Sequence, residues 1–438
     1  MKMNKLTAAI LIGMLLGILT GQLVRSFAPD AVAGYATNIT LLTDLFLRLI
    51  KMIIAPLVFT TLTVGIARMG DSKTVGRVGA KTMGWFLSAS LISLTLGLIM
   101  VHLLHPGVGL NLPLPDANAN SGIAPSAINL KDFIAHAIPK SVVEAMANNE
   151  ILQIVVFSVF FGMAAAAVGE AAQPVVRVLA ATADIMLKVT GFVMAVAPVA
   201  VFAAISAMVA KEGMGILTTY GTFMAQFYLA LFILWAVLFG LGGLFLGKRI
   251  RQLPGFIREP ALLAFSTASS EAAYPKTLQR LEQFGCSKRI ASFVMPMGYS
   301  FNLDGSMMYC TFATLFIAQA YGIELSMGQQ ITMLLLLMVT SKGMAGVPRA
   351  SLVVIAATLS QFHIPEAGIL LLLGVDHFLD MGRSATNVLG NAIAACVVAR
   401  SEGDLGEAVD DETWARQQAE LAAAESLTPL DTAQPREA

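Results

Sequence analysis

The sequence predicts an all-α integral membrane protein with eight transmembrane helices and two opposed re-entrant helical hairpins. Hydrophobic residues make up 56% of the 438 residues and charged residues only 13%, about half the ~25% of a soluble domain. Apolar stretches long enough to cross a bilayer recur along the chain. The basic residues lie in short runs between these stretches, which indicates loops of a membrane protein and argues against a nucleic-acid binder.

Six apolar stretches before residue 250 are each predicted to span the bilayer, since each provides about 20 largely apolar residues. They are Leu6–Leu23, Leu41–Ile66, Met83–Leu104, Ile151–Val168, Ile185–Val209 and Phe223–Leu246. The first resembles a signal peptide, but its apolar run is longer than a typical signal core and many spans follow it. We therefore expect it to be retained as the first helix.

The basic clusters orient these spans by the positive-inside rule. Lys2 and Lys5 place the N-terminus in the cytoplasm, and basic residues in the ranges 68–81 and 248–258 mark two further cytoplasmic loops. The loop 105–149 is nearly uncharged and is expected to lie outside. The composition and the basic loops thus predict a multi-pass membrane protein with a cytoplasmic N-terminus.

A re-entrant hairpin is predicted between residues 258 and 276. The basic cluster at 276–289 is cytoplasmic by the same rule as the cluster before it, and the segment between them is too short to cross twice. A hairpin with Ser266–Glu271 at its tip satisfies both constraints. The alternative of ten ordinary helices would place the second cluster outside, against the rule.

A second hairpin is predicted after the seventh span, Ile290–Ala320. The apolar pieces Ile331–Thr340 and Leu352–Leu359 are each too short to span, and a glycine-containing stretch separates them. Such backbone is tolerated at membrane depth only inside protein or along an aqueous cavity. Ile369–Ala399 then spans inward, so that both termini are cytoplasmic. Residues 403–438 form an acidic tail that is expected to be disordered, and three cysteines cannot form a disulfide scaffold.

The last predicted span carries five polar residues on one helical stripe. Asp376, Asp380, Arg383, Asn387 and Asn391 follow at steps of four, three, four and four, which places them on one face. Ionisable residues inside a span cost several kcal/mol and by default mark a functional site. The structural alternative is a salt-bridge ladder from Asp380 to Arg383.

The seventh span contains the sequence Ser300–Ser306, SFNLDGS, which is poor helix chemistry because Asn and Asp compete for backbone groups and Gly weakens a helix. An unwound stretch there would expose carbonyls beside the Asp304 carboxylate, which suits a hard cation. A merely kinked helix is the alternative. The hairpin tips add the hydroxyls of Ser269 and Ser270 and the backbone amides of 343–347, which favour an anion.

Four motifs occur in a fixed order: STASSE, SFNLDGS, SKGMAGVP and DMGRSATNVLGN. With them the chain resembles the dicarboxylate/amino acid:cation symporters of the glutamate-transporter fold, from Leu6 to about Glu402. The resemblance implies inverted repeats, a homotrimer, a small anionic substrate and no cofactor. It also implies that residues 1–247 are mainly scaffold, with helices three and six belonging to the moving part, and that 248–402 form the core transport domain.

The resemblance assigns roles in substrate binding. Arg383 offers a planar charged fork for a substrate side-chain carboxylate. Asp380 matches the family residue that accepts an α-ammonium, and members that carry only dicarboxylates lack an Asp there. Asn387 would hold the α-carboxylate or amine region. The remaining pocket residues are expected to be Ser269, Ser270, Ser306 and Val347. An acidic amino acid is therefore favoured, with a C4-dicarboxylate as the alternative.

The coupling ion is expected to be the proton. Sodium-coupled members hold one cation with two Asn and a final Asp, and the last of these positions is Asn391 here, which removes a charge from a hard-cation site. The third-helix hydroxyl pair of another sodium site corresponds to Ala89 and Ser90. Sodium remains the alternative, bound by Asn302, Asp304, Asn387 and Asn391.

The group that carries the proton is left open by the sequence. Some relatives have a protonatable Glu where this chain has Cys310, whose thiol would stay neutral. Glu271 is one candidate, since burial raises a carboxyl pKa, although it could instead cap the second arm of its hairpin. His377 also titrates near neutrality.

Two other classes were compared with a transporter. An intramembrane aspartyl protease is excluded because Asp376 and Asp380 lie on one helix and no Gly-x-Gly-Asp is present. A channel lined by the polar stripe fits less well than alternating access, because opposed hairpins around a charged pocket suit a substrate-sized site. The sequence thus predicts a symporter and not an enzyme.

Overall fold

The computed structural model describes residues 5–67, 72–108, 138–213, 220–341, 350–410, 412–414 and 416. Within these ranges helices are joined by turns and short irregular segments, and one isolated β-bridge joins Cys286 and Leu405. Val347, the residues around the second hairpin tip, Lys2 and most of the acidic tail lie outside the described residues. Among the described helical stretches, five are long and apolar enough to cross a membrane: Ala8–Phe27, Pro29–Ala67, Lys73–Leu104, Ile151–Met194 and Gly221–Arg251.

The helices of the first half are α1 (Lys5–Phe27), α2 (Val32–Ala67), α3 (Ser72–Leu104), α5 (Val142–Ala147), α6 (Ile151–Val168), α7 (Gln173–Met194), α8 (Ala197–Glu212) and α10 (Gly221–Leu246). Those of the second half are α11 (Leu253–Thr267), α12 (Ser270–Gln283), α13 (Lys288–Phe301), α14 (Asp304–Ala320), α15 (Met327–Thr340), α16 (Ala350–Gln361), α17 (Leu370–Leu373) and α18 (Asp376–Glu402). Short 3-10 turns, including η3 (Gly247–Arg251), join some of them.

Two predicted spans are wrong in being drawn as continuous helices. The stretch Ile185–Val209 is divided, because α7 ends at Met194 and α8 begins at Ala197 with Pro198 in its first turn; proline lacks an N–H and its ring excludes the preceding helical turn. The stretch Ile369–Ala399 is divided between α17 and α18 at Gly374 and Val375. The predicted fourth span coincides with α6.

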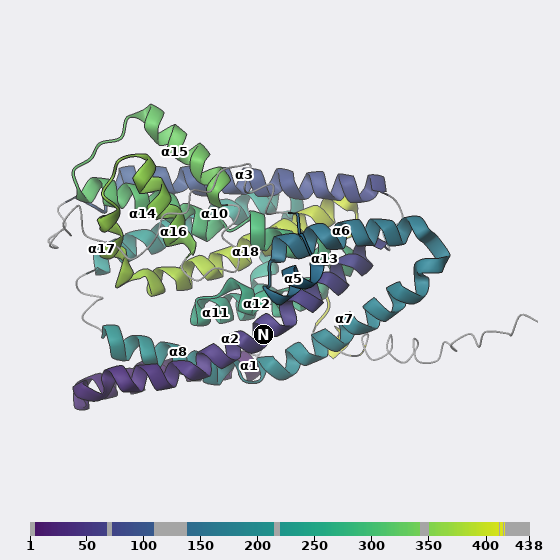
Figure 1. The fold of residues 1–438 in the computed structure, drawn as a ribbon, viewed down its shortest axis with the longest axis horizontal. Coiled ribbons are helices and arrows are strands. Elements are labelled where there is room, and N and C mark those ends of the chain that lie inside the picture. The colour runs from purple at the N-terminus through teal and green to yellow at the C-terminus, as the bar shows by residue number, and fades with distance from the viewer. Residues whose placement is uncertain are drawn as a thin grey trace, which may run out of the picture.

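The pair α1–α8 forms one layer at the edge of the molecule, with α2 packed against α6, α7 and α8 (Figure 1). Three glycines of α1 lie against the α8 backbone. A Cβ added at Gly13, Gly17 or Gly21 would lie 2.6, 2.8 and 2.5 Å from the carbonyl oxygens of Pro198, Phe202 and Ser206, respectively. Small residues thus allow the close backbone approach that stabilises helix pairs in lipid.

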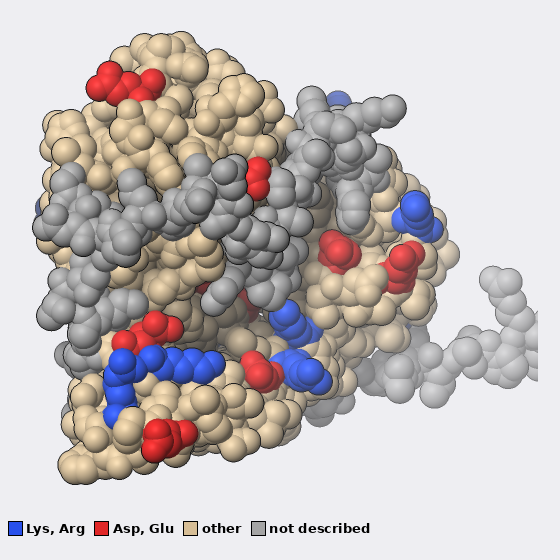
Figure 2. Space-filling model, turned by 60° about the vertical axis from the view of Figure 1, so that its left-hand side comes forward, with Lys and Arg blue, Asp and Glu red and all other residues tan. Residues whose placement is uncertain are grey.

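Helix α18 lies at the centre of the second half. It packs against α10, α11, α12, α13 and α14 (Figure 1), and every residue from Met381 to Ala399 is buried. Figure 2 shows an outer face on which few charged residues interrupt a largely uncharged surface. The polar residues of α18 between Met381 and Ala399 are therefore enclosed by protein.

Helices α11 and α12 form the first predicted hairpin, joined at Ala268, whose φ of 48° is left-handed. The turn falls within the predicted tip Ser266–Glu271. The side-chain oxygen of Ser269 accepts a hydrogen bond from the Ala272 amide and caps α12. Helices α15 and α16 correspond to the second hairpin, and the residues that join them lie outside the described ranges.

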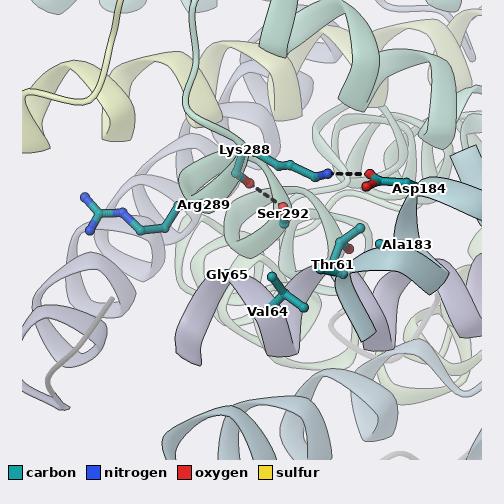
Figure 3. Close-up of a pocket in the computed structure, with 9 residues that line it drawn as sticks. Thr61, Val64, Gly65, Ala183, Asp184, Lys288, Arg289 and Ser292 are labelled. Atoms are coloured by element: carbon teal, nitrogen blue, oxygen red, sulfur yellow. Dashed lines mark hydrogen bonds and ion pairs between the residues drawn. The ribbon is translucent and has the colours of Figure 1, made fainter. Parts of the chain in front are cut away.

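A cavity of about 140 Å³ separates α13 from α2 and α7 (Figure 3). Lys288 of α13 reaches across it, with its Nζ 2.8 Å from a carboxylate oxygen of Asp184 on α7. The Arg289 side chain points away from Lys288 in Figure 3 and instead pairs with Asp404. The half-exposed Lys288–Asp184 pair thus links α7 of the first half to α13.

Candidate functional site

The predicted stripe of α18 meets α13 and α14 along its length. Asp376, Arg383, Asn387 and Asn391 are buried, and each contacts a residue in the range 302–309. The side chain of Asp380 retains 32% of its exposure. The stripe is thus a buried polar seam with one carboxylate still open to a further partner.

Arg383 lies between two carboxylates and an aromatic ring. Its Nη2 is 3.2 Å from Asp376 and 3.0 Å from Asp380, and its guanidinium carbon lies 4.0 Å from the centre of the Tyr309 ring. Tyr309 in turn donates a hydrogen bond to Asp376 at 3.2 Å. The Arg383 Nε and Nη1 are buried without a hydrogen-bond partner.

These unused N–H groups are informative because a buried charged donor without a partner is costly. Since Arg383 has hydrogen-bonding capacity left over, the site can accept another anionic group. Two carboxylates beside one guanidinium carry a net charge of −1, so the site also has capacity for a cationic group near Asp380.

The helix break predicted in SFNLDGS is confirmed. Helix α13 ends at Phe301 and α14 begins at Asp304, with Asn302 and Leu303 in non-helical conformations. The freed amides of Gly305 and Ser306 donate to Asn387 Oδ1 at 2.9 and 3.4 Å, and Asn387 Nδ2 donates to Ser306 Oγ. Asn387 therefore caps α14 from the neighbouring helix.

Asn302, Asp304 and Asn391 form a second buried network. Asn302 Nδ2 donates to Asp304 Oδ2 at 3.0 Å and to Asn391 Oδ1 at 3.1 Å, while Ser93 of α3 donates to Asp304 Oδ1 at 3.1 Å. Asn302 Oδ1 and Asn391 Nδ2 are buried without partners. Of the four residues predicted as one ion site, three share this network, and Asn387 accepts a hydrogen bond from Gly305 directly beside it.

The hairpin residues serve local structure in the described contacts. Ser269 caps α12, and the Ser270 carbonyl accepts a hydrogen bond from Tyr299 at 3.0 Å. Glu271 lies in the first turn of α12, where a negative charge is favoured by the helix dipole. The capping oxygen belongs to Ser269, so the side-chain cap suggested for Glu271 is supplied by its neighbour.

Of the other candidates, Cys310 is buried on α14 with its sulfur 4.0 Å from the Ser351 carbonyl oxygen. Ser90 donates to the Phe301 carbonyl at 3.4 Å, and Ala89 is buried. His377 is partly buried in the first turn of α18.

Three contributors were missed by sequence reasoning. Asp376 was placed on the stripe without a role, although its spacing of seven from Arg383 puts the two on one face two turns apart. Ser93 lies one turn beyond Ser90, on a face that the serine spacing indicates. Tyr309 has no sequence signal, since an aromatic in a buried helix is usually core.

This architecture defines a multi-pass helical membrane protein with a charged polar seam enclosed by helices, which is the organisation of a transporter. The chain belongs to the Sodium:dicarboxylate symporter family, whose model matches residues 6–401. It is therefore a member of a transporter family and not an enzyme.

Relatives of the chain carry two kinds of name. The chain is 40% identical over 404 residues to the proton/sodium-glutamate symport protein of Bacillus caldotenax, covering 91% of this chain and 94% of that one. It is 40% identical over 422 residues to a C4-dicarboxylate transport protein of Rhizobium johnstonii (95% and 94%). It is 38% identical over 391 residues to the proton/glutamate-aspartate symporter of Bacillus subtilis (89% and 94%). Identity alone does not separate the two substrate classes.

Proposed function

We propose that the protein is a secondary active symporter that imports glutamate or aspartate together with protons. The observation that carries the proposal is the pairing of Arg383, with two buried unpartnered nitrogens, and Asp380, with a partly exposed carboxylate. An acidic amino acid presents the complementary groups, a carboxylate for the guanidinium and an ammonium for the aspartate.

The charge balance favours an amino acid over a C4-dicarboxylate. Two carboxylates already share the Arg383 Nη2, so a dicarboxylate would add two more negative charges without a new cation. An ammonium beside Asp380 offsets one of them. The C4-dicarboxylate symporter stays the alternative, because relatives with that name are equally similar.

The transport cycle that we propose is alternating access within the eight-span topology with two opposed re-entrant hairpins and inverted repeats. Residues 248–402, with helices three and six, would form the moving domain against the rest of residues 1–247. The working form would be a homotrimer in the bacterial inner membrane with both termini cytoplasmic. Ser269, Ser270, Ser306, Asn387 and Val347 would complete the pocket around Arg383.

The chemistry and hydrogen bonding of the Asn391 side chain favour protons over sodium as the coupling ion. Its Oδ1 already accepts a hydrogen bond from Asn302, and an amide supplies no negative charge to a hard cation. Glu271 in the first hairpin is the proposed proton carrier. Ser93 supports the sodium alternative, because it adds a hydroxyl beside Asp304 and the unpartnered Asn302 Oδ1.

Competition for uptake into proteoliposomes tests the substrate assignment. Labelled glutamate is supplied with an inward proton gradient, and unlabelled aspartate or succinate is added as competitor. Aspartate should inhibit strongly and succinate weakly; inhibition by succinate alone would favour the dicarboxylate alternative. Glu271→Gln should flatten the pH profile of uptake, and an unchanged profile would remove Glu271 as the proton carrier.

A further inference from the structure

The chain beyond α18 turns back and runs along the junction between α12 and α13. The Gly406 amide donates to the Gly285 carbonyl and the Val409 amide to the Gln283 carbonyl, both at 2.8 Å. The Ser287 amide donates to the Asp404 carbonyl at 3.2 Å, which completes a short antiparallel pairing around the Cys286–Leu405 bridge. Residues 404–409, which composition assigns to a disordered tail, thus continue the fold.

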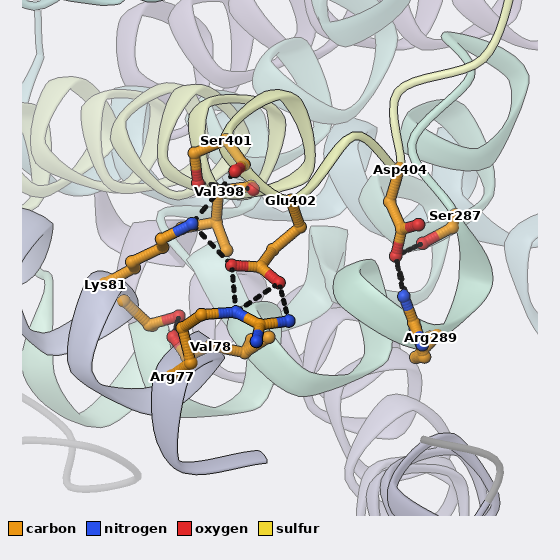
Figure 4. A network of polar contacts seen from close by, with 10 residues as sticks. Arg77, Val78, Lys81, Ser287, Arg289, Val398, Ser401, Glu402 and Asp404 are labelled. Atoms are coloured by element: carbon orange, nitrogen blue, oxygen red, sulfur yellow. Dashed lines mark hydrogen bonds and ion pairs between the residues drawn. The ribbon is translucent and has the colours of Figure 1, made fainter. Parts of the chain in front are cut away.

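Figure 4 shows side chains of α3 and α13 that hold the end of α18 and the start of this return segment. The Glu402 carboxylate forms ion pairs with Arg77 Nη2 at 2.8 Å and with Lys81 Nζ at 2.5 Å, both from α3. Asp404 pairs with Arg289 at the start of α13. The Arg249 guanidinium of η3 donates to the Gly406 carbonyl at 2.6 Å. The segment is therefore fastened to α13 and η3, and the end of α18 just before it is fastened to α3, all on the side assigned above to the moving domain.

The segment ends at the opposite side of the domain boundary. The Asp410 carboxylate accepts a hydrogen bond from the Thr413 amide at 2.7 Å and starts a helical turn that carries Trp414. Trp414 lines a cavity of about 610 Å³, whose other walls come from α1, α7, α8 and α12. The indole thus lies where the first hairpin faces three helices of the proposed scaffold.

We propose that this cavity is the docking site for the chain's own tail, and that residues 404–410 and 412–414, the tail latch, restrain movement of α12 against α1, α7 and α8. The latch rests on the proposed function, because it acts only if these two sides move relative to each other. The first residues of the latch are held by polar contacts to α13 and η3, and they would move together with the transport domain. The free end of the latch is an aromatic side chain in a largely apolar cavity, which is suited to repeated docking and release because apolar contact is non-directional.

Uptake by the full-length chain tests the latch. Trp414→Ala should raise the initial rate of aspartate uptake by up to about tenfold, the factor for losing about 1.4 kcal/mol of apolar burial, with KM unchanged. Trp414→Phe keeps an aromatic ring and should stay near the wild-type rate. Glu407→Gln, an exposed change within the same segment, is the matched control. An unchanged rate in Trp414→Ala would overturn the latch.

A fluorescence readout is independent of transport. Gly191 lines the same cavity and has nothing within 4 Å of an added Cβ, so Gly191→Cys can carry a bimane label; the three native cysteines are buried. Tryptophan quenches bimane on contact, so the label should brighten when Trp414→Phe is added. Equal brightness would overturn docking of the tail. A brightened label in a protein that does not transport aspartate would retain the docking site and reject only the proposed function.

Discussion

The pairs α1–α8 and α14–α18 are both tightly packed, but different chemistry stabilises them. Helix α1 approaches α8 through glycines that lie against backbone carbonyls. Arg25 of α1 adds a charged contact, because its guanidinium donates hydrogen bonds to the carbonyls of Ala210 and Lys211 near the end of α8. Helix α18 meets α14 through Asp376 and Arg383, which both contact Tyr309, and through Asn387, which accepts hydrogen bonds from the first turn of α14. Glycine packing in lipid needs no polar group, whereas enclosed charges destabilise unless they are paired. The buried charges of the α18 seam destabilise the fold unless they are paired, so the seam is the region to which we assign a function.

Among the variants that test this comparison, Arg383→Ala is expected to have the largest effect, a loss of aspartate uptake. Losing the guanidinium leaves buried carboxylates unpaired at a cost of about 3–5 kcal/mol, which corresponds to a loss of uptake of at least about 100-fold. Uptake of labelled aspartate measures it, with purified protein whose size matches that of the purified wild type. Arg25→Ala, an arginine of the glycine-packed pair, is the control and should leave substrate affinity unchanged. Normal uptake by the Arg383 variant would reject the pocket.

Gly17→Ala tests the other side of the comparison. The new Cβ would lie 2.8 Å from the Phe202 carbonyl oxygen, and overpacking of this kind costs about 1–3 kcal/mol. Thermal unfolding in detergent should show a lower midpoint, while uptake per folded molecule stays constant. Gly34→Ala, where an added Cβ meets nothing within 4 Å, should not shift the midpoint. Equal midpoints for the two variants would show that close backbone approach does not stabilise this pair.

Glu282 tests whether a buried charge destabilises the protein where α12 of the second half faces α1, α7 and α8 of the first. Burial raises the pKa of this carboxyl to about 7, so the folded state favours the neutral form, and stability should increase as the pH falls from 8 to 6. Each unit of difference from the ordinary value is worth about 1.4 kcal/mol. Between pH 8 and 6 the folded carboxyl gains about one such unit, so an effect of about 1 kcal/mol is expected in this window. Glu282→Gln should remove this dependence of the unfolding midpoint.

Glu402→Gln is the control with the opposite sign. A hydrogen bond from Arg77 holds the pKa of Glu402 below its ordinary range, so its contribution is present above the unfolded pKa and is lost only as the pH falls through the lower folded pKa. Between pH 6 and 8 this variant should therefore keep the wild-type slope. A flat wild-type profile would contradict the burial argument for Glu282.

Asn391→Asp is expected to give the smallest effect. The added carboxylate would place a second negative charge beside Asp304 in the proposed cation site, and sodium should then stimulate uptake about tenfold more than in the wild type. Uptake with and without sodium at fixed pH and membrane potential measures the change. Strict sodium dependence of the wild type, with no effect of a proton ionophore beyond loss of potential, would contradict proton coupling.

Much of the fold could be predicted from the sequence because the bilayer imposes simple rules. Span length and basic loops located the helices, and the residues Asn302 and Asp304 revealed the break between α13 and α14. The interruption at Pro198 and the tail segment 404–409 were not predicted. The first depends on one local steric conflict, and the second on backbone pairing with residues more than 100 positions away.

The candidate site was predicted in part for a similar reason. Residues on one helix share a face by periodicity, so the α18 stripe could be identified from spacing. The partners Tyr309 and Ser93 come from other helices, and only packing brings them to Arg383 and Asp304. Likewise, periodicity could not separate Asn387, which caps α14, from the network around Asn391.

Paired uptake of labelled aspartate and labelled succinate by the wild type and Asp380→Asn tests the central claim most directly. Only aspartate presents an ammonium to the carboxylate, so the wild type should take up aspartate, and the variant should lose aspartate uptake at least about tenfold more than any succinate uptake. Equal losses for the two substrates, or a wild type that transports succinate but not aspartate, would contradict the assignment of the α18 seam as an amino acid site.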